Sequence, residues 1–223
     1  MAVTDYASAF KRRFTIDPAR AALVVIDMQY ASGSRQHGLG ASLTERGEEQ
    51  TGSWRFDRIE QVVVPNLQLL LDRCRAHGVQ VVYVTLGSAT GDFADVVAYL
   101  RPLVEQTDNR AGAPNHRILD AIAPQDGDLV VNKTTASAFQ SSDLDDQLRE
   151  RGITQLLLAG ISTNSCVEST GRDGADLGYE CLMVDDACAC AGPDWHDAAL
   201  RNFDRLFGRV GSTADVLAEA GLR

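Results

Sequence analysis

Short apolar runs rich in β-branched residues recur along the chain, separated by longer stretches with helical periodicity. The runs are almost continuously hydrophobic and do not alternate with polar residues. This pattern predicts parallel strands that are covered on both faces. The expected strands are residues 22–26, 79–85, 128–131 and 156–159, with 181–184 as a fifth and 209–211 as a possible sixth.

The stretches between the strands predict helices, and most of them end at a glycine. A glycine at a helix C-terminus readily adopts the left-handed conformation that ends a helix. The alternation of strand and helix predicts an α/β fold, a three-layer α/β/α sandwich with a mostly parallel central sheet, as a single domain over residues 1–223. The expected helices are residues 57–77, 92–106, 142–151, 166–177 and 195–207, and the glycines are Gly78, Gly152, Gly178 and Gly208.

The net charge of -10 over 223 residues changes the list of possible partners. Phosphate groups would meet a repulsive field, which disfavours nucleic acids and anionic membranes and favours a small-molecule substrate. The basic residues near the N-terminus precede no apolar run, and no stretch approaches about 18 uninterrupted apolar residues. We therefore expect a cytoplasmic protein.

The five cysteines form an odd set without CxxC spacing. Without an export signal we expect no disulfides. Cys188 and Cys190, two residues apart, are poorly spaced for a joint zinc site. We expect neither a metal nor a cofactor.

Three polar or nucleophilic residues follow predicted strands. Asp27 comes directly after the first strand, Lys133 follows the third, and Cys166 begins a helix after the fourth. Ligands of open α/β sheets bind beyond the carboxyl ends of the strands, so these positions favour a common site. Each residue also has a plainer explanation: a helix cap for Asp27, a solvated side chain for Lys133 and apolar packing for Cys166.

Together, the three residues support one reaction scheme. A helix start and a nearby lysine lower the pKa of a thiol, which favours Cys166 as a nucleophile toward a carbonyl. Asp27 would exchange protons with the thiol and the leaving amine, and Lys133 would hold the ion pair. Backbone N–H groups at residues 161–166 would bind the oxyanion.

The chain resembles the isochorismatase-like cysteine hydrolases over nearly its whole length. The resemblance rests on the motifs ALVVIDMQ at 22–29, NKTTASAF at 132–139, AGISTNSCVEST at 159–170 and GYECLMVDDA at 178–187. It implies an Asp27, Lys133 and Cys166 triad, a non-proline cis peptide at Gly160–Ile161 and a homo-oligomer, either dimer or tetramer. The other positions that we assign from it are Gly160, Ile161, Ser162 and Ser165 for the oxyanion and Gln29, Phe139 and Asn164 for the substrate.

The branches of this family differ in chemistry. Nicotinamidase-like members carry an Asp-x-His metal motif, which this sequence lacks, and isochorismatases proper tend to lack the cysteine. The block around Cys166 resembles the ureidoacrylate, biuret and N-carbamoylsarcosine amidohydrolases, which favours a small amide, ureido or carbamoyl substrate. Two alternatives remain: vinyl ether hydrolysis with Asp27 as the acid, and an inactive binding protein of the same fold.

The segment 31–55 lacks a clear period and is long for a connecting loop, so it is a candidate lid or interface. Arginine suits a carboxylate because its guanidinium can bond both oxygens, and Arg35 is our candidate clamp. A solvated loop or a subunit contact explains the segment equally well. The same clamp could also be supplied by other polar residues of this segment, namely His37, Arg46, Trp54 and Arg55. A second polar cluster with the same alternatives precedes the third strand and consists of Arg110, Asn115, His116 and Arg117, and for His196 we expect a structural role.

Overall fold

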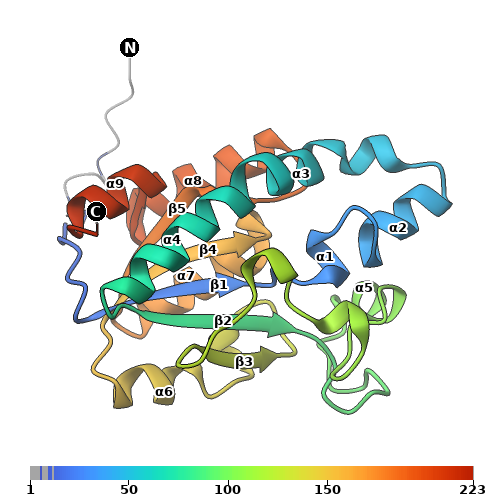
Figure 1. Cartoon of the computed structure of the whole chain (residues 1–223), viewed down its shortest axis with the longest axis horizontal. Helices are drawn as coiled ribbons and strands as arrows, with labels where there is room; N and C mark the ends of the chain where they lie inside the picture. The colour runs from blue at the N-terminus through green and yellow to red at the C-terminus, as the bar shows by residue number, and fades with distance from the viewer. Residues whose placement is uncertain (1–5, 7–9, 12, 223) are drawn as a thin grey trace.

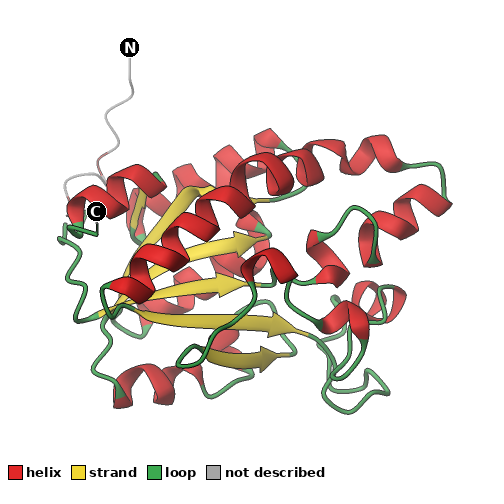
Figure 2. Cartoon of the chain, in the orientation of Figure 1, coloured by secondary structure: helices red, strands yellow, loops and turns green. Residues whose placement is uncertain are grey.

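A single six-stranded sheet forms the centre of the protein. The structure is a computed structural model that describes residues 6, 10, 11 and 13–222. The strands run in the order β3-β2-β1-β4-β5-β6, and every neighbouring pair is parallel, so all arrows point the same way in Figures 1 and 2. The strands are β1 (Ala21–Ile26), β2 (Gln80–Leu86), β3 (Leu129–Lys133), β4 (Gln155–Ile161), β5 (Glu180–Ala189) and β6 (Arg209–Gly211).

Helices cover both faces of the sheet because its central strands are apolar on both sides. Alternate residues of β1 enter two separate cores, with Leu23 in one and Val24 in the other. The first core contains residues of α3 (Ser53–Arg58), η3 (Ile59–Val63), α4 (Val64–Ala76) and α9 (Thr213–Glu219). The second contains residues of α6 (Leu144–Glu150), η7 (Thr163–Val167) and α8 (Pro193–Leu206), and α7 (Glu168–Asp176) packs against it through Ala175. The predicted three-layer α/β/α class is confirmed (Figure 1).

Some element predictions were wrong. Residues 92–100, which we expected to be helical, form bends and turns, and only α5 (Arg101–Gln106) is a helix. The reason lies in Asp95, whose carboxylate accepts hydrogen bonds from the Ser88 hydroxyl and the Ala89 N–H, each at 2.7 Å, and so stabilises a turn. The sheet's last strand is followed by α9, which the sequence pattern did not predict.

The segment 31–55 is not an irregular loop. It contains the short helices α1 (Tyr30–Gly33), α2 (Gly38–Glu45) and η2 (Glu49–Gly52) and the start of α3, and it covers the carboxyl ends of the strands (Figure 1). Leu43 is buried in the first core and Leu39 packs against it, so tertiary contacts stabilise helices that are too short to form alone. Three short 3-10 helices lie in the connections on either side of β3: η4 (Pro114–His116), η5 (Asp120–Ile122) and η6 (Ala138–Gln140). No helix in the described part of the chain is long and apolar enough to cross a membrane.

Strand β4 approaches β1 most closely at Gly160. Gly160 pairs with Ile26 and has φ of +111°, and a Cβ atom there would lie 2.1 Å from the Ile26 carbonyl oxygen. No side chain fits this position. The glycine therefore lets the loop that carries Cys166 leave the sheet beside Asp27.

Replacing Gly160 by alanine is expected to lower the free energy of unfolding by at least about 3 kcal/mol, since it adds a backbone clash to an unfavourable φ. Gly47→Ala is the matched control. Gly47 also has a positive φ, +69°, but nothing lies within 4 Å of its added Cβ. The control should lose only about 1–2 kcal/mol. Urea denaturation of both variants measures the difference, and equal losses would show that the approach to Ile26 is not tight.

Candidate active site

The predicted triad comes together at the carboxyl edge of the sheet. Asp27 follows β1, Lys133 ends β3, and Cys166 lies in η7, which follows β4. The strands that precede Asp27 and carry Lys133 are not neighbours, because β2 lies between β1 and β3. Two strand spacings amount to about 9–10 Å. The long lysine side chain therefore passes over the end of β2 to reach the aspartate.

Asp27 and Lys133 form a buried ion pair. The Lys133 Nζ atom donates to Asp27 Oδ2 at 2.9 Å, and the two residues are 0% and 3% exposed, respectively. Asp27 has φ of +54°, in the left-handed region that aspartate tolerates better than most residues. Burial raises the pKa of the Asp27 carboxyl group, against the opposing charge of Lys133.

Cys166 completes the cluster. It is 5% exposed, and its side chain lies close enough to Asp27 and Lys133 to affect the pKa of both. Burial, followed by the negative charge of Asp27, raises the pKa of the Cys166 thiol to about 12, and Lys133 only partly offsets this. The expected lowering of this pKa was therefore wrong, because desolvation outweighs the lysine. The thiol is protonated at neutral pH and needs a base, and Asp27 is the carboxylate beside it.

The turn before Cys166 contains a cis peptide bond between Ile161 and Ser162. We expected it one bond earlier, at Gly160–Ile161. That prediction was wrong because Gly160 and Ile161 still belong to β4 and pair with β5. Of the four predicted oxyanion residues, Ser162 and Ser165 lie in the turn itself. The Ser165 N–H donates to the Ser162 carbonyl at 3.0 Å, and the Ser165 hydroxyl lies 3.9 Å from the Cys166 Sγ atom.

Two of the predicted substrate-binding residues are occupied by contacts within the protein. Gln29 is fully buried: its side-chain oxygen accepts from the Leu86 N–H at 2.9 Å, and its amide nitrogen donates to the His116 carbonyl at 2.8 Å. Gln29 thus ties the end of β1 to the end of β2. The Phe139 ring stacks on Tyr179, with 5.6 Å between ring centroids, and packs against the second core.

The other two predicted substrate-binding residues, Asn164 and Arg35, differ in their surroundings. Asn164 is exposed and lies in η7, two residues before Cys166. Arg35 is paired at the surface, where its Nη2 atom lies 2.6 Å from Asp57 and 3.0 Å from Glu60. The structure shows no contact between Arg35 and the triad. Its charge is already balanced by its own chain.

Arg55, which the sequence could not separate from its neighbours in the segment, is the arginine closest to the chemistry. It is buried, and its Nη1 atom donates to the Ser162 hydroxyl at 2.8 Å. Its Nε and Nη2 atoms donate to the Ser32 carbonyl at 3.2 and 3.0 Å. No periodicity or motif marks this residue, so only the fold could identify it.

Two histidines flank the site. His116 is partly buried, its Nδ1 atom lies 2.9 Å from the Asn109 side-chain oxygen, and burial lowers its pKa. His196 bridges Thr163 and Asp185, with its Nδ1 atom 2.9 Å from the threonine hydroxyl and its Nε2 atom 2.8 Å from the carboxylate. Thr163 begins η7, so His196 supports the nucleophile's turn, in agreement with the structural role that we expected.

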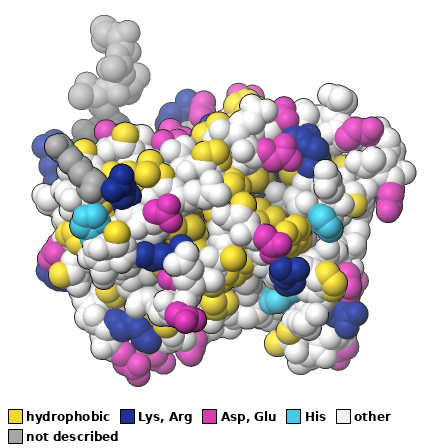
Figure 3. Space-filling view, in the orientation of Figure 1, with side chains coloured by type: hydrophobic (Ala, Val, Ile, Leu, Met, Phe, Trp, Pro, Cys, Tyr) yellow, Lys and Arg dark blue, Asp and Glu magenta, His cyan; other side chains and the backbone are white. Residues whose placement is uncertain are grey.

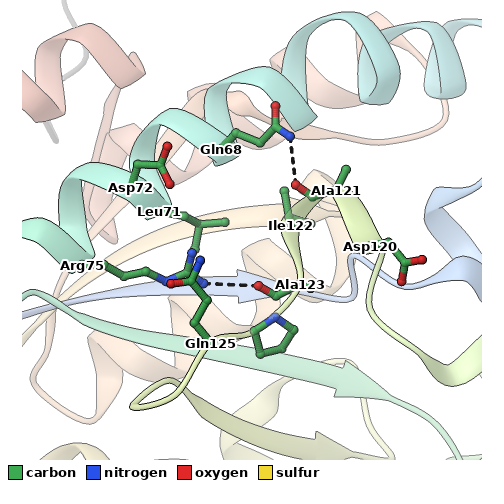
Figure 4. A pocket seen from close by; sticks show the side chains of 10 residues that line it. Gln68, Leu71, Asp72, Arg75, Asp120, Ala121, Ile122, Ala123 and Gln125 are labelled. Carbon is green, nitrogen blue, oxygen red and sulfur yellow. Dashed lines mark hydrogen bonds between the residues drawn. The ribbon is translucent and has the colours of Figure 1, made fainter.

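The hollow drawn in Figure 4 does not lie at the triad. The hollow in Figure 4 lies between α4 and the segment 120–125, where Gln68 donates to the Ala121 carbonyl and Arg75 to that of Ala123. None of its lining residues belongs to the triad. On the face shown in Figure 3, side chains of both charges are interspersed with apolar ones. All five cysteines are free and buried, and the described residues contain no group of three or more His, Cys, Asp or Glu that could hold a metal ion.

With this geometry established, known proteins show what the chain is similar to. The model of the isochorismatase domain family matches residues 21–215, which is most of the sequence. The chain belongs to the isochorismatase family.

Individual isochorismatase-family relatives are similar over most of their length. The ureidoacrylate amidohydrolase RutB of Caulobacter vibrioides is 34% identical over 215 residues, which cover 90% of this chain and 91% of the relative. The RutB protein of Stutzerimonas stutzeri is 35% identical, with 86% and 79% covered.

Solved structures of the family agree with the fold. A cysteine hydrolase from Pseudomonas syringae pv. phaseolicola superposes with a TM-score of 0.77 at 29% identity, covering 94% of this chain and 96% of that one. The N-carbamoylsarcosine amidase from Thermoplasma acidophilum has a TM-score of 0.65 at 27% identity, covering 87% and 96%. The chain is therefore a hydrolase of this family by both sequence and structure.

Proposed function

We propose that the protein is a metal-independent cysteine amidohydrolase that cleaves a C–N bond of a small amide, ureido or carbamoyl compound. The observation that carries the proposal is the buried cluster of Asp27, Lys133 and Cys166, in which a protonated thiol lies beside a carboxylate held by an ammonium group. The names of the RutB relatives and of the N-carbamoylsarcosine amidase support the substrate class.

The first half of the reaction transfers the acyl or carbamoyl group to Cys166. Asp27 takes the thiol proton as Sγ attacks the substrate carbonyl carbon, forming a C–S bond and an oxyanion. The oxyanion then collapses, the C–N bond breaks, and the departing nitrogen receives the proton from Asp27. Lys133 keeps the carboxylate in place and balances its charge while the proton moves.

The second half releases the product. Asp27, again a carboxylate, takes a proton from a water molecule, which attacks the thioester carbonyl and breaks the C–S bond. The thiolate regains a proton from Asp27, so the enzyme returns to its starting state. Backbone N–H groups of η7 would stabilise the oxyanion in both halves, apart from that of Ser165, which already donates to the Ser162 carbonyl.

A substrate panel tests the proposal. The compounds are biuret, ureidoacrylate, N-carbamoylsarcosine, nicotinamide and isochorismate, with ammonia followed for the first four and pyruvate for the last. We expect ammonia from at least one ureido or carbamoyl compound and none that depends on added metal, and the best substrate identifies the branch. Pyruvate alone would instead support vinyl ether hydrolysis with Asp27 as the acid, a reading compatible with its raised pKa.

The sequence-based expectations of one domain, a cytoplasmic location and a homo-oligomer stay predictions that accompany this proposal. The described strands all belong to one sheet, which supports the first of them.

A further inference from the structure

Arg55 is a buried cation whose charge has no direct partner. The residue is 7% exposed. Within the described ranges, no carboxylate lies within ion-pairing distance of its guanidinium, whereas the other arginines of this region, Arg35 and Arg58, bind carboxylates of Asp57 and Asp185. A buried charge is costly unless it is paired. The carboxylate partner that Arg55 lacks among the described residues can therefore come from a ligand.

The guanidinium also keeps hydrogen-bonding capacity. Arginine has five N–H groups in a planar fork. Three of them donate, two to the Ser32 carbonyl and one to the Ser162 hydroxyl. The remaining two, one on each terminal nitrogen, have no acceptor among the described residues. Two neighbouring N–H groups match the two oxygens of a carboxylate.

The contacts of Arg55 place it at the catalytic cluster. Ser162 begins the turn that carries Cys166, and the Ser32 hydroxyl donates to the Asp27 carbonyl at 2.9 Å. Burial lowers the pKa of Arg55, and Cys190, Cys166 and Asp27, in that order, act against this lowering. Arg55 thus lies between the loop after β1 and the loop after β4.

The charged groups of this cluster also favour an anionic ligand. Lys133 and Arg55 are the two cationic side chains of the cluster, Asp27 is its one carboxylate, and Lys133 pairs with that carboxylate. The site therefore has one uncompensated positive charge, although the whole chain has a net charge of -10. An anionic substrate would balance it.

We propose that Arg55 binds a carboxylate of the substrate and so selects amide or ureido compounds that carry one. This inference rests on the proposed function and narrows its substrate class. The carboxylate accepts from the two unused N–H groups, which orients the reacting carbonyl toward the Cys166 thiol. Among the clamp candidates of segment 31–55, the structure thereby favours Arg55, which is buried, over Arg35, which pairs with Asp57 and Glu60.

Two other roles for Arg55 make different predictions. A brace between Ser32 and Ser162 would affect every reagent at Cys166 equally. A cation that stabilises the Cys166 thiolate would, when removed, slow charged and uncharged reagents, and its field would favour the anionic one as well. Only a carboxylate-binding Arg55 that leaves the thiol unaffected changes the rate of just one of two reagents that differ in the carboxylate alone.

Iodoacetate and iodoacetamide are such a pair, and both alkylate thiols. We would measure the rate of Cys166 alkylation by each, using peptide mass spectrometry, in the wild type, in Arg55→Met and in Arg73→Met, which removes an exposed arginine of α4 as the charge-matched control. The ratio of the iodoacetate rate to the iodoacetamide rate should fall about tenfold in Arg55→Met, as expected for a lost charge-assisted hydrogen bond. The Arg73→Met ratio should equal that of the wild type.

Other outcomes overturn the inference in distinguishable ways. If the iodoacetamide rate changes in Arg55→Met as well, Arg55 is a brace or a thiolate stabiliser. If Arg55→Met fails to fold, the wild type alone tests the inference. The ratio of the iodoacetate rate to the iodoacetamide rate at Cys166 must then exceed the same ratio for glutathione under the same conditions. Equal ratios exclude carboxylate binding. If Cys166 reacts with neither reagent, both the proposed function and this inference are wrong. A wild type that hydrolyses ureido compounds without this selectivity removes the inference alone.

Discussion

Replacing Cys166 by alanine is expected to lower kcat for the best amide or ureido substrate by at least about 10³-fold, because removing a nucleophile removes the covalent pathway. The fold should persist, since alanine is smaller than cysteine and introduces no polar group. Ammonia release by the purified variant, with thermal unfolding followed by circular dichroism, measures both effects.

Cys181→Ala is the matched control for this experiment. Cys181 is also buried, and burial raises its pKa to about 12 as well, but it lies within β5. The control should retain activity. A Cys166→Ala protein with wild-type activity would contradict covalent catalysis and favour vinyl ether hydrolysis or another acid-catalysed reaction.

Replacing Lys133 by methionine is expected to destabilise the protein by about 3–5 kcal/mol, because it leaves the buried Asp27 carboxylate without its partner. Activity should also fall, since Asp27 would take up a proton and no longer act as a base. The pKa of Asp27 in the folded state would rise further above its value in the unfolded state. The folded state would then bind more protons than the unfolded state. The stability of the variant should therefore decrease as pH rises from about 4 toward neutrality.

Urea denaturation at several pH values tests this prediction, and the double variant Asp27→Asn, Lys133→Met is its control. Without the carboxylate, the loss of Lys133 no longer leaves a buried charge, so the double variant should be more stable at pH 7 than Lys133→Met alone. A double variant that shows the sum of two independent losses would contradict the coupling. Neither variant should hydrolyse substrate, because both lack a working base.

Much of the fold could be predicted from local patterns. The apolar runs located all six strands, because parallel strands covered on both faces must be hydrophobic almost throughout. The helix at 92–106 was overestimated because the Asp95 carboxylate stabilises a turn through hydrogen bonds that the pattern does not reveal. Helix α9 and the short helices of segment 31–55 escaped prediction because packing against the core, more than propensity, stabilises them.

For the site, the sequence by itself determined which chemical groups follow the strands: Asp27, Lys133 and the Cys166 turn. The carboxyl ends of parallel strands lie at one edge, so residues far apart in the chain could be assigned to one place. Only the tertiary structure decided how these groups interact. It placed β2 beneath the Lys133 side chain, and it buried Cys166 so that its pKa rises.

The difference between Arg35 and Arg55 was likewise decided by the tertiary structure. Arg35 and Arg55 come from the same segment and look alike in the sequence, but Arg35 is neutralised by Asp57 and Glu60 whereas Arg55 is buried without a carboxylate. Pairing and desolvation depend on which side chains the fold brings within a few ångströms, and no local pattern encodes that. The sequence determined the chemistry available to this protein, and the tertiary structure decided which charges are left for a substrate.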